Sequence, residues 1–361
     1  MKTVEQIRTS VAAAAVPNSE TTRRPIWLTD QRTVGVARDH KARLELFLVA
    51  PGLEAKSAAI KNQFSVNLWQ QEKGNPFEAA RIVLPGADHF VSIIALIAAE
   101  ILRHGFESKP HAAFLLAEPL IELALLQVGI GEDAALGLLG ELYFLEQLLI
   151  RAKAGTDRRT LMNGWQGFGR SARDYSSPEI AIEVKATNGA ASRHRISNMR
   201  QVTPDVSLSG TVSRLYLFSI GFVPTQSSGR SVARQTQATL DLLIDGITGT
   251  DRERATAIFL DRVAQYGTPG PGNPGGYDHN TMSDWPTYSR ERDVAWARLY
   301  DMSDEAIQIP RTTDLQSFQH LVENSITFDL ILPVKIRGEL NPIADITEVL
   351  DDVLASMLQN P

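Results

Sequence analysis

The chain has no cysteine among its 361 residues, which excludes disulfides, thiolate catalysis and cysteine-based zinc sites. It also lacks a phosphate-binding Gly-Lys loop, a Gly-x-Ser-x-Gly elbow, an internal repeat and a heptad array. Its longest apolar segments are unsuited to a bilayer, because Val91–Leu102 is too short and Ala112–Ile130 contains glutamates. Met1–Val16 contains Glu5 and only a short alanine run, so we expect no signal peptide and a cytoplasmic protein.

The charge of the chain is unevenly distributed. Its net charge of −6 excludes a wholly non-specific nucleic-acid coat, which needs clustered positive charge. Residues 151–200 nevertheless contain ten Lys or Arg and four acids, a local charge of +6. A basic stretch around acidic residues suits a phosphodiester substrate, and the alternative is a set of solvated loops.

One segment combines a strand pattern with paired charges. Along Ile180–Lys185 every second residue is a large aliphatic one, and alternate residues of a strand share a face. The other face carries Glu183 and Lys185. Taken alone, such a pair is typical of a surface ion pair on an edge strand.

A second carboxylate is expected beside this strand. Asp174 precedes the sequence Ser176-Ser177-Pro178, which predicts a turn because proline restricts both its own backbone and that of the residue before it. Asp174 and Glu183 would then lie at neighbouring ends of two paired strands. Two carboxylates with Lys185 beside them are suited to bind Mg²⁺.

A third acid lies on a predicted helix. Asp133–Lys153 has leucines at the spacing of a buried helical face, and Glu141 falls inside that apolar stripe. A buried carboxylate needs a partner, a metal ion or a proton. Nearby, Trp165 and Phe168 are candidates for stacking on a base, although we favour core packing for both.

The predicted fold is mixed α/β in three parts. Residues 1–110 form a β-rich domain closed by a helix, 111–225 a core, and 226–361 a mixed α/β domain with strands that include Ile307–Ile309. The core order is a helix, a short strand near Leu161, a strand ending at Asp174, the strand ending at Lys185, a short helix near 197–201 and a buried strand at 215–220.

The pattern Glu141, Asp174, Glu183-Val184-Lys185 and Gln201 resembles the PD-(D/E)XK nuclease superfamily. The similarity is closer to a bacterial branch usually called the PD-(D/E)XK motif proteins. The segments that carry this closer similarity are Gly140–Leu145, Gly164-Trp165, Ile182–Thr187 and His194–Ser197. The resemblance covers about a third of the chain and implies the restriction-endonuclease-like order αβββαβ. Two departures are that Arg173 stands where proline is frequent and that Asp174 and Glu183 are closely spaced.

The resemblance implies roles for the residues of the central motif. Asp174, Glu183 and the carbonyl of Val184 would bind Mg²⁺, for which Mn²⁺ can substitute. Lys185 would hold the attacking water.

The resemblance also implies roles around this motif. Glu141 would bind a second metal ion or orient its waters, and Gln201 would position Lys185 or a phosphate. The basic residues expected to contact phosphates are Arg170, Arg173, Arg193, His194, Arg195 and Arg200.

The expected activity is that of a Mg²⁺-dependent endonuclease on double-stranded DNA. By resemblance, it would serve a bacterial restriction or phage-defence system, with a DNA methyltransferase and an ATPase or helicase as partners and a homodimer as the assembly. One alternative is a non-catalytic DNA-binding or assembly subunit with a nuclease-like core. A weaker alternative is an enzyme that processes small phosphorylated molecules.

Overall fold

The chain forms two compact units. One contains Met1–Gly129 and Asn280–Pro286, and the other contains Ile130–His279 and Thr287–Pro361. The three domains predicted from the sequence stay a prediction. The computed structural model describes residues 2–61, 63–86, 88–126, 130–153, 155–169, 171, 173–177, 179–204, 214–225, 228–266, 276–315, 318, 320, 326–338 and 340–359.

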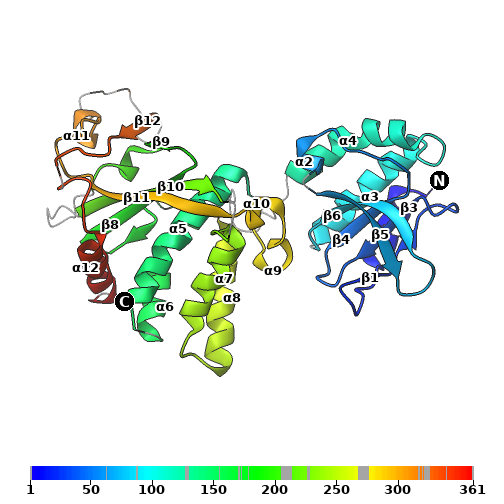
Figure 1. Cartoon of the computed structure of the whole chain (residues 1–361), viewed down its shortest axis with the longest axis horizontal. Helices are drawn as coiled ribbons and strands as arrows, with labels where there is room; N and C mark the ends of the chain where they lie inside the picture. The colour runs from blue at the N-terminus through cyan, green and yellow to red at the C-terminus, as the bar shows by residue number, and fades with distance from the viewer. Residues whose placement is uncertain are drawn as a thin grey trace. The chain divides into compact units, whose positions relative to one another are not determined.

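The first unit is a curled six-stranded sheet with helices packed against it (Figure 1). Its elements are α1 (Val4–Ala12), β1 (Thr22–Arg23), β2 (Ile26–Trp27), β3 (Val34–Arg38), β4 (Leu44–Leu48), α2 (Ala58–Lys61), β5 (Phe64–Gln71), β6 (Phe77–Leu84), α3 (Asp88–Arg103) and α4 (Pro110–Leu126). The strand order is β1-β5-β6-β4-β3-β2. Aliphatic side chains of β3, β4 and β6 pack with those of α3 in one core, which confirms the predicted β-rich texture of this region.

A buried ion cluster lies within this unit. Glu45 on β4 is fully buried and pairs with Arg23 at 2.7 Å and with Arg81 at 2.9 Å. Both guanidinium groups also lie over the ring of Trp69. Burial raises the pKa of Glu45, and the two arginines oppose that shift. A buried carboxylate is tolerated here because two cations offset its desolvation.

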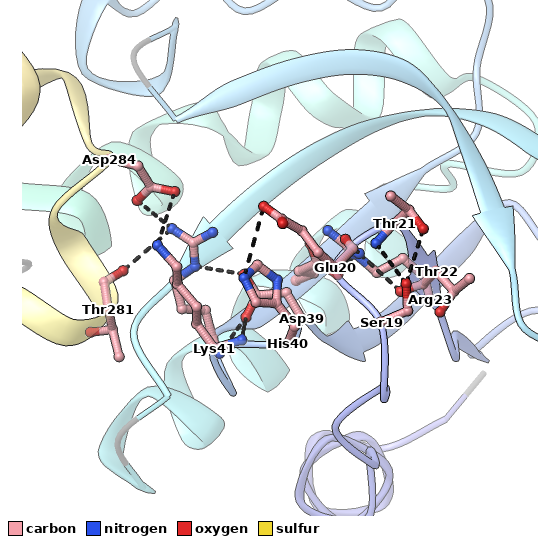
Figure 2. A network of polar contacts seen from close by, with 12 residues as sticks. Ser19, Glu20, Thr21, Thr22, Arg23, Asp39, His40, Lys41, Thr281 and Asp284 are labelled. Carbon is pink, nitrogen blue, oxygen red and sulfur yellow. Dashed lines mark hydrogen bonds and ion pairs between the residues drawn. The ribbon is translucent and has the colours of Figure 1, made fainter.

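A second buried acid, Asp39, pairs with an arginine that also binds the later segment of the unit. Asp39 accepts from Nε of Arg43 at 2.6 Å, and Nη1 of Arg43 donates to Asp284 at 2.6 Å. Arg43 also donates to the carbonyl of Thr281 at 3.3 Å. Figure 2 shows Asp39, Thr281 and Asp284 around these contacts. These bonds attach Asn280–Pro286 to the first unit, although it follows β4 by more than 200 residues.

The second unit contains two sheets flanked by helices (Figure 1). Its elements are α5 (Glu132–Arg151), α6 (Thr156–Gly164), β7 (Tyr175–Ser176), β8 (Ile180–Thr187), β9 (Ser192–Ile196), the 3₁₀ helix η1 (Met199–Gln201), β10 (Arg214–Pro224), α7 (Val232–Ile244), α8 (Gly249–Gln265), β11 (Arg292–Asp301), α11 (Thr312–Leu315), β12 (Phe328–Leu332) and α12 (Ile346–Gln359). Two short helices, α9 (His279–Met282) and α10 (Pro286–Ser289), lie where the chain passes between the units.

The main sheet of this unit has the order β11-β10-β8-β7. β8 and β10 are parallel, and the other two pairs are antiparallel. α5 packs on one face of β8, and the β9–β12 pair covers part of the other face through a core that includes Ala181, Leu217, Tyr300 and Leu330. The predicted helix at Asp133–Lys153 and the strands at 180–185 and 215–220 are confirmed as α5, β8 and β10. None of the helices within the described ranges is long and apolar enough to cross a membrane.

Three local predictions are wrong. The expected strand near Leu161 is the helix α6, in which Leu161, Met162 and Arg158 are buried at helical spacing. The basic segment after β8 contains an unpredicted strand, β9, in which buried and exposed residues alternate. Ile307–Ile309 forms no strand, and Ile307 instead packs into the core beneath β9 and β12. In each case tertiary packing decides the conformation of a short segment whose sequence pattern is ambiguous.

We expect Glu45→Ala to lower the free energy of unfolding by about 3 kcal/mol, because it leaves two arginines without their buried partner. Glu5→Ala, which breaks the exposed Arg8–Glu5 pair, should change it far less, because water screens an exposed ion pair. Urea denaturation of both variants tests the comparison. Equal losses would contradict a stabilising role for the buried cluster.

Candidate active site

Strand β8 places its two charged residues on the face opposite α5. Gly140 on α5 allows close packing, since a Cβ there would lie 2.9 Å from Cβ of Ala186 and 3.5 Å from Cγ1 of Val184. The even-numbered face of β8 therefore lies against the helix. Glu183 and Lys185 share the other face, as the alternation predicts, and Nζ of Lys185 lies 2.9 Å from Oε1 of Glu183.

Asp174 lies beside Glu183 on the neighbouring chain segment. Its amide donates to the carbonyl of Ile182 at 3.1 Å, just before β7 pairs with β8. Its Oδ2 accepts from the amide of Val184 at 2.6 Å. The two acids therefore lie beside each other as predicted, but no strand ends at Asp174, which precedes β7. The hydrogen bond from Val184 fixes one oxygen of Asp174 and leaves Oδ1 outside that bond.

Glu141 reaches the same place from α5. Although it is on a helix, its side chain is only 4% exposed. Nε1 of Trp165 donates to its Oε2 at 2.7 Å, and Oη of Tyr266 donates to its Oε1 at 2.7 Å. A Cβ at Gly167 would lie 1.7 Å from that Oε2 and 3.0 Å from Oδ1 of Asp174. Both carboxylates therefore lie against one glycine, and any side chain at residue 167 would displace them.

The pKa of each of the three carboxyl groups is raised, and burial is the largest cause for each. Burial, the hydrogen bonds that oppose it and the charge of Glu183 leave the pKa of Glu141 at about 7. Burial and the charges of Glu141 and Glu183 raise the pKa of Asp174 well above its usual value. Burial also raises the pKa of Glu183, whereas Lys185 and the charge of Arg173 lower it. Two cations thus act on three acids.

Lys185 stays protonated in this surrounding. Burial alone would lower its pKa, but the ion pair with Glu183 and the charges of Asp174 and Glu141 outweigh burial and raise it. Its side chain is 19% exposed, more than that of Glu183 at 3%. Lys185 therefore links the buried acids to the surface.

The donor set fits a hard divalent cation. Within the described ranges, no three acidic or histidine side chains already surround a common metal position. The carboxylates are nevertheless buried together and short of positive charge, which is the condition that a bound Mg²⁺ relieves. Asp174 and Glu183 offer oxygens for such an ion, whereas both oxygens of Glu141 already accept hydrogen bonds.

Gln201 and two of the predicted phosphate contacts have other partners. Oε1 of Gln201 accepts from the amide of Ser197 at 3.0 Å and from its hydroxyl at 3.3 Å. Arg193 and Arg195 point outward from β9, and both pair with Asp329. These contacts tie η1 and β9 to their neighbours.

The remaining predicted phosphate contacts differ in how far they are buried. His194 is buried and donates to or accepts from the hydroxyl of Ser219 at 2.6 Å, and burial with the charge of Lys185 lowers its pKa to about 4. Arg173 is buried and donates to the carbonyl of Thr203 at 2.6 Å. The structure therefore does not favour either as a surface phosphate contact. Arg200 is exposed, and Arg170 lies outside the described residues.

Sequence reasoning missed the residues that hold Glu141. Trp165 is fully buried, which supports core packing over base stacking, but its indole also binds the carboxylate. Phe168 packs edge-on against Trp165 and lies beneath Arg262. Tyr266 follows Glu141 by 125 residues, and no local pattern links the two.

In metal-free buffer we expect Glu141→Gln to raise the free energy of unfolding at pH 8 by on the order of 2 kcal/mol and to change it little at pH 4. The wild-type carboxyl has a pKa of 4.5 unfolded and about 7 folded, so stability falls as pH rises through that window and the loss is complete above it. The glutamine can accept from Trp165 and donate to the hydroxyl of Tyr266.

Chemical denaturation at both pH values gives the result. Glu179→Gln, at an exposed position just before β8, serves as the control and should change stability equally at both. A pH-independent effect of Glu141→Gln would contradict the raised pKa.

The sequence comparisons agree with the motif. One family model matches residues 118–270, less than half of the chain, and is described as "Putative PD-(D/E)XK family member, (DUF4420)". The matched stretch contains Glu141, Asp174, Glu183 and Lys185. Comparison with curated proteins and with solved structures found no match. The family whose model matches is thus assigned to the superfamily that the motif resembles.

Proposed function

We propose that this chain is a metal-dependent DNA endonuclease with its centre on β8, at Glu183 and Lys185. One observation carries the proposal: Asp174 and Glu183 lie side by side on adjacent extended segments, with the ammonium of Lys185 2.9 Å from Glu183. Buried acids beside a lysine that is partly exposed are suited to phosphodiester hydrolysis, because the reacting phosphate gains negative charge. The family match over residues 118–270 supports the same chemistry.

The residues of the centre would have distinct roles. Asp174 and Glu183 would hold Mg²⁺, which when bound neutralises charge on a phosphate oxygen and makes a bound water more acidic. The amide of Val184 keeps Asp174 oriented. Lys185, protonated and partly exposed, would hold the attacking water and offset the charge that develops at the phosphate. Glu141, fixed by Trp165 and Tyr266, would orient the surrounding waters.

The biological setting rests on resemblance alone. In this proposal the endonuclease serves a restriction or phage-defence system and acts on double-stranded DNA together with a DNA methyltransferase and an ATPase or helicase. A homodimer would allow both strands to be cut. Purified protein that needs such partners would bind DNA without cutting it.

A second candidate function is a non-catalytic DNA-binding or assembly subunit. The observation in its favour is that the acids already have protein partners: Lys185 pairs with Glu183, and both oxygens of Glu141 accept hydrogen bonds. Within the described ranges no metal position is preformed. In this alternative the cluster would serve only to hold β7 and β8 together.

Lys185→Ala should reduce cleavage of supercoiled plasmid in Mg²⁺ or Mn²⁺ by about 100-fold or more, because it removes the cation that faces the reacting phosphate. The variant should keep the fold and metal binding. Plasmid nicking followed on gels, with EDTA as the metal-free control, measures the effect.

Lys153→Ala is the matched control, because Lys153 is exposed in the same basic stretch. It should cleave as the wild type does. Undiminished cleavage by Lys185→Ala would contradict the assignment of this centre. Absence of metal binding as well as of cleavage would favour the second candidate function.

A further inference from the structure

One cation on the sheet face of Lys185 lies outside the matched family region and has an unusual environment. Arg298 on β11 is paired in register with Ser219 on β10, and Ser219 is paired in register with Lys185 on β8. Residues paired across neighbouring strands share a face. Lys185, Ser219 and Arg298 therefore form one row across the sheet, and their backbones span two strand spacings, about 10 Å.

Arg298 is held in place by an aromatic platform. Its guanidinium lies 4.3 Å from the ring centroid of Trp296, two residues earlier on the same face. Trp296 lies over Gly221, where a Cβ would be 2.2 Å from the indole. A glycine at residue 221 is thus required for the indole to lie flat on the sheet. The stack of glycine, tryptophan and arginine orders a cation without using a carboxylate.

Arg298 differs from nearby arginines in its ion pairing. Arg292, on the same strand, pairs with Glu132, and Arg234 pairs with Glu291. Across the part of the chain that the structure describes, no Asp or Glu oxygen forms an ion pair with Arg298. Arg298 and Trp296 are both partly exposed. An ordered arginine that is accessible and lacks an acidic partner is suited to bind an anion.

The side chains between Lys185 and Arg298 are polar and neutral. Ser219 is buried beneath His194, and Ser192 hydrogen-bonds to Ser219 at 2.7 Å. The pKa of His194 is lowered to about 4, so it adds no charge near neutral pH. Lys185 and Arg298 thus flank a neutral group of buried side chains, which adds no charge between the two cations.

We propose that Arg298, stacked on Trp296, binds a backbone phosphate of duplex DNA adjacent to the phosphate held at Lys185. This inference rests on the proposed function and extends it to a substrate-binding residue. Arg298 takes the role of phosphate contact that was expected of four other residues. Of these, His194 and Arg173 are buried, and Arg193 and Arg195 pair with Asp329. Positive charge complements the DNA backbone, and the row is continuous with the candidate centre.

The test is binding of a fluorescently labelled DNA duplex in EDTA, followed by anisotropy between about 50 and 200 mM salt. Arg298→Ala should raise Kd about 5-fold to 10-fold and should make the salt dependence shallower by about one unit in the slope of log K against log salt. Arg298→Lys keeps the charge but not the flat stacking group, so it should keep the slope and raise Kd less.

Arg214→Ala is the matched control, because Arg214 is on β10 and pairs with Asp352. It should leave Kd and slope unchanged. Arg298→Ala values equal to those of this control, or no binding of the duplex by the wild type, would overturn the inference. DNA binding that depends on Arg298 in a protein that does not bind Mn²⁺ would support the inference and contradict the proposed metal-dependent hydrolysis.

Discussion

The desolvation of three neighbouring carboxyl groups, those of the buried Glu141 and Glu183 and of the half-buried Asp174, is the constraint on which the candidate site depends. Glu141, Asp174 and Glu183 come from a helix and two extended segments, and each lies where burial raises its pKa. Lys185 and Arg173 supply two positive charges, which do not balance three ionised acids. The site is therefore complete only when protons or a cation join it. This deficit of positive charge is a stronger indication of metal binding than the side-chain positions taken singly.

The surrounding fold holds these acids together through close backbone approach. Gly140 lets α5 approach β8, and Gly167 leaves room for two carboxylates that a side chain would displace. Trp165 and Tyr266 then fix Glu141 from α6 and from the end of α8. Residues from two segments that contribute no acid to the site therefore set the orientation of Glu141. On β10, Gly221 likewise leaves room for the indole of Trp296, over which Arg298 lies.

The sequence predicts the elements that carry the acids but not their surroundings. Helix α5 and strand β8 are long and strongly periodic, and the turn before β8 places Asp174 beside Glu183. Short elements follow tertiary packing instead, so α6 was expected as a strand and β9 was missed. Charge alone also misled: among the arginines and the histidine expected to meet phosphate, several are buried or paired with Asp329. The cross-strand register that aligns Arg298 with Lys185 has no signature in local sequence.

Titration of the protein with Mn²⁺ by calorimetry at pH 8 tests the account most directly. The wild type should bind the ion, and Asp174→Asn should bind it at least about 10-fold more weakly, because a neutral amide replaces a charged ligand. Mn²⁺ should also raise the melting temperature of the wild type, since a ligand that binds only the folded state stabilises it. Absence of binding, or equal binding by the wild type and Asp174→Asn, would contradict the assignment of the carboxylate cluster as a metal centre.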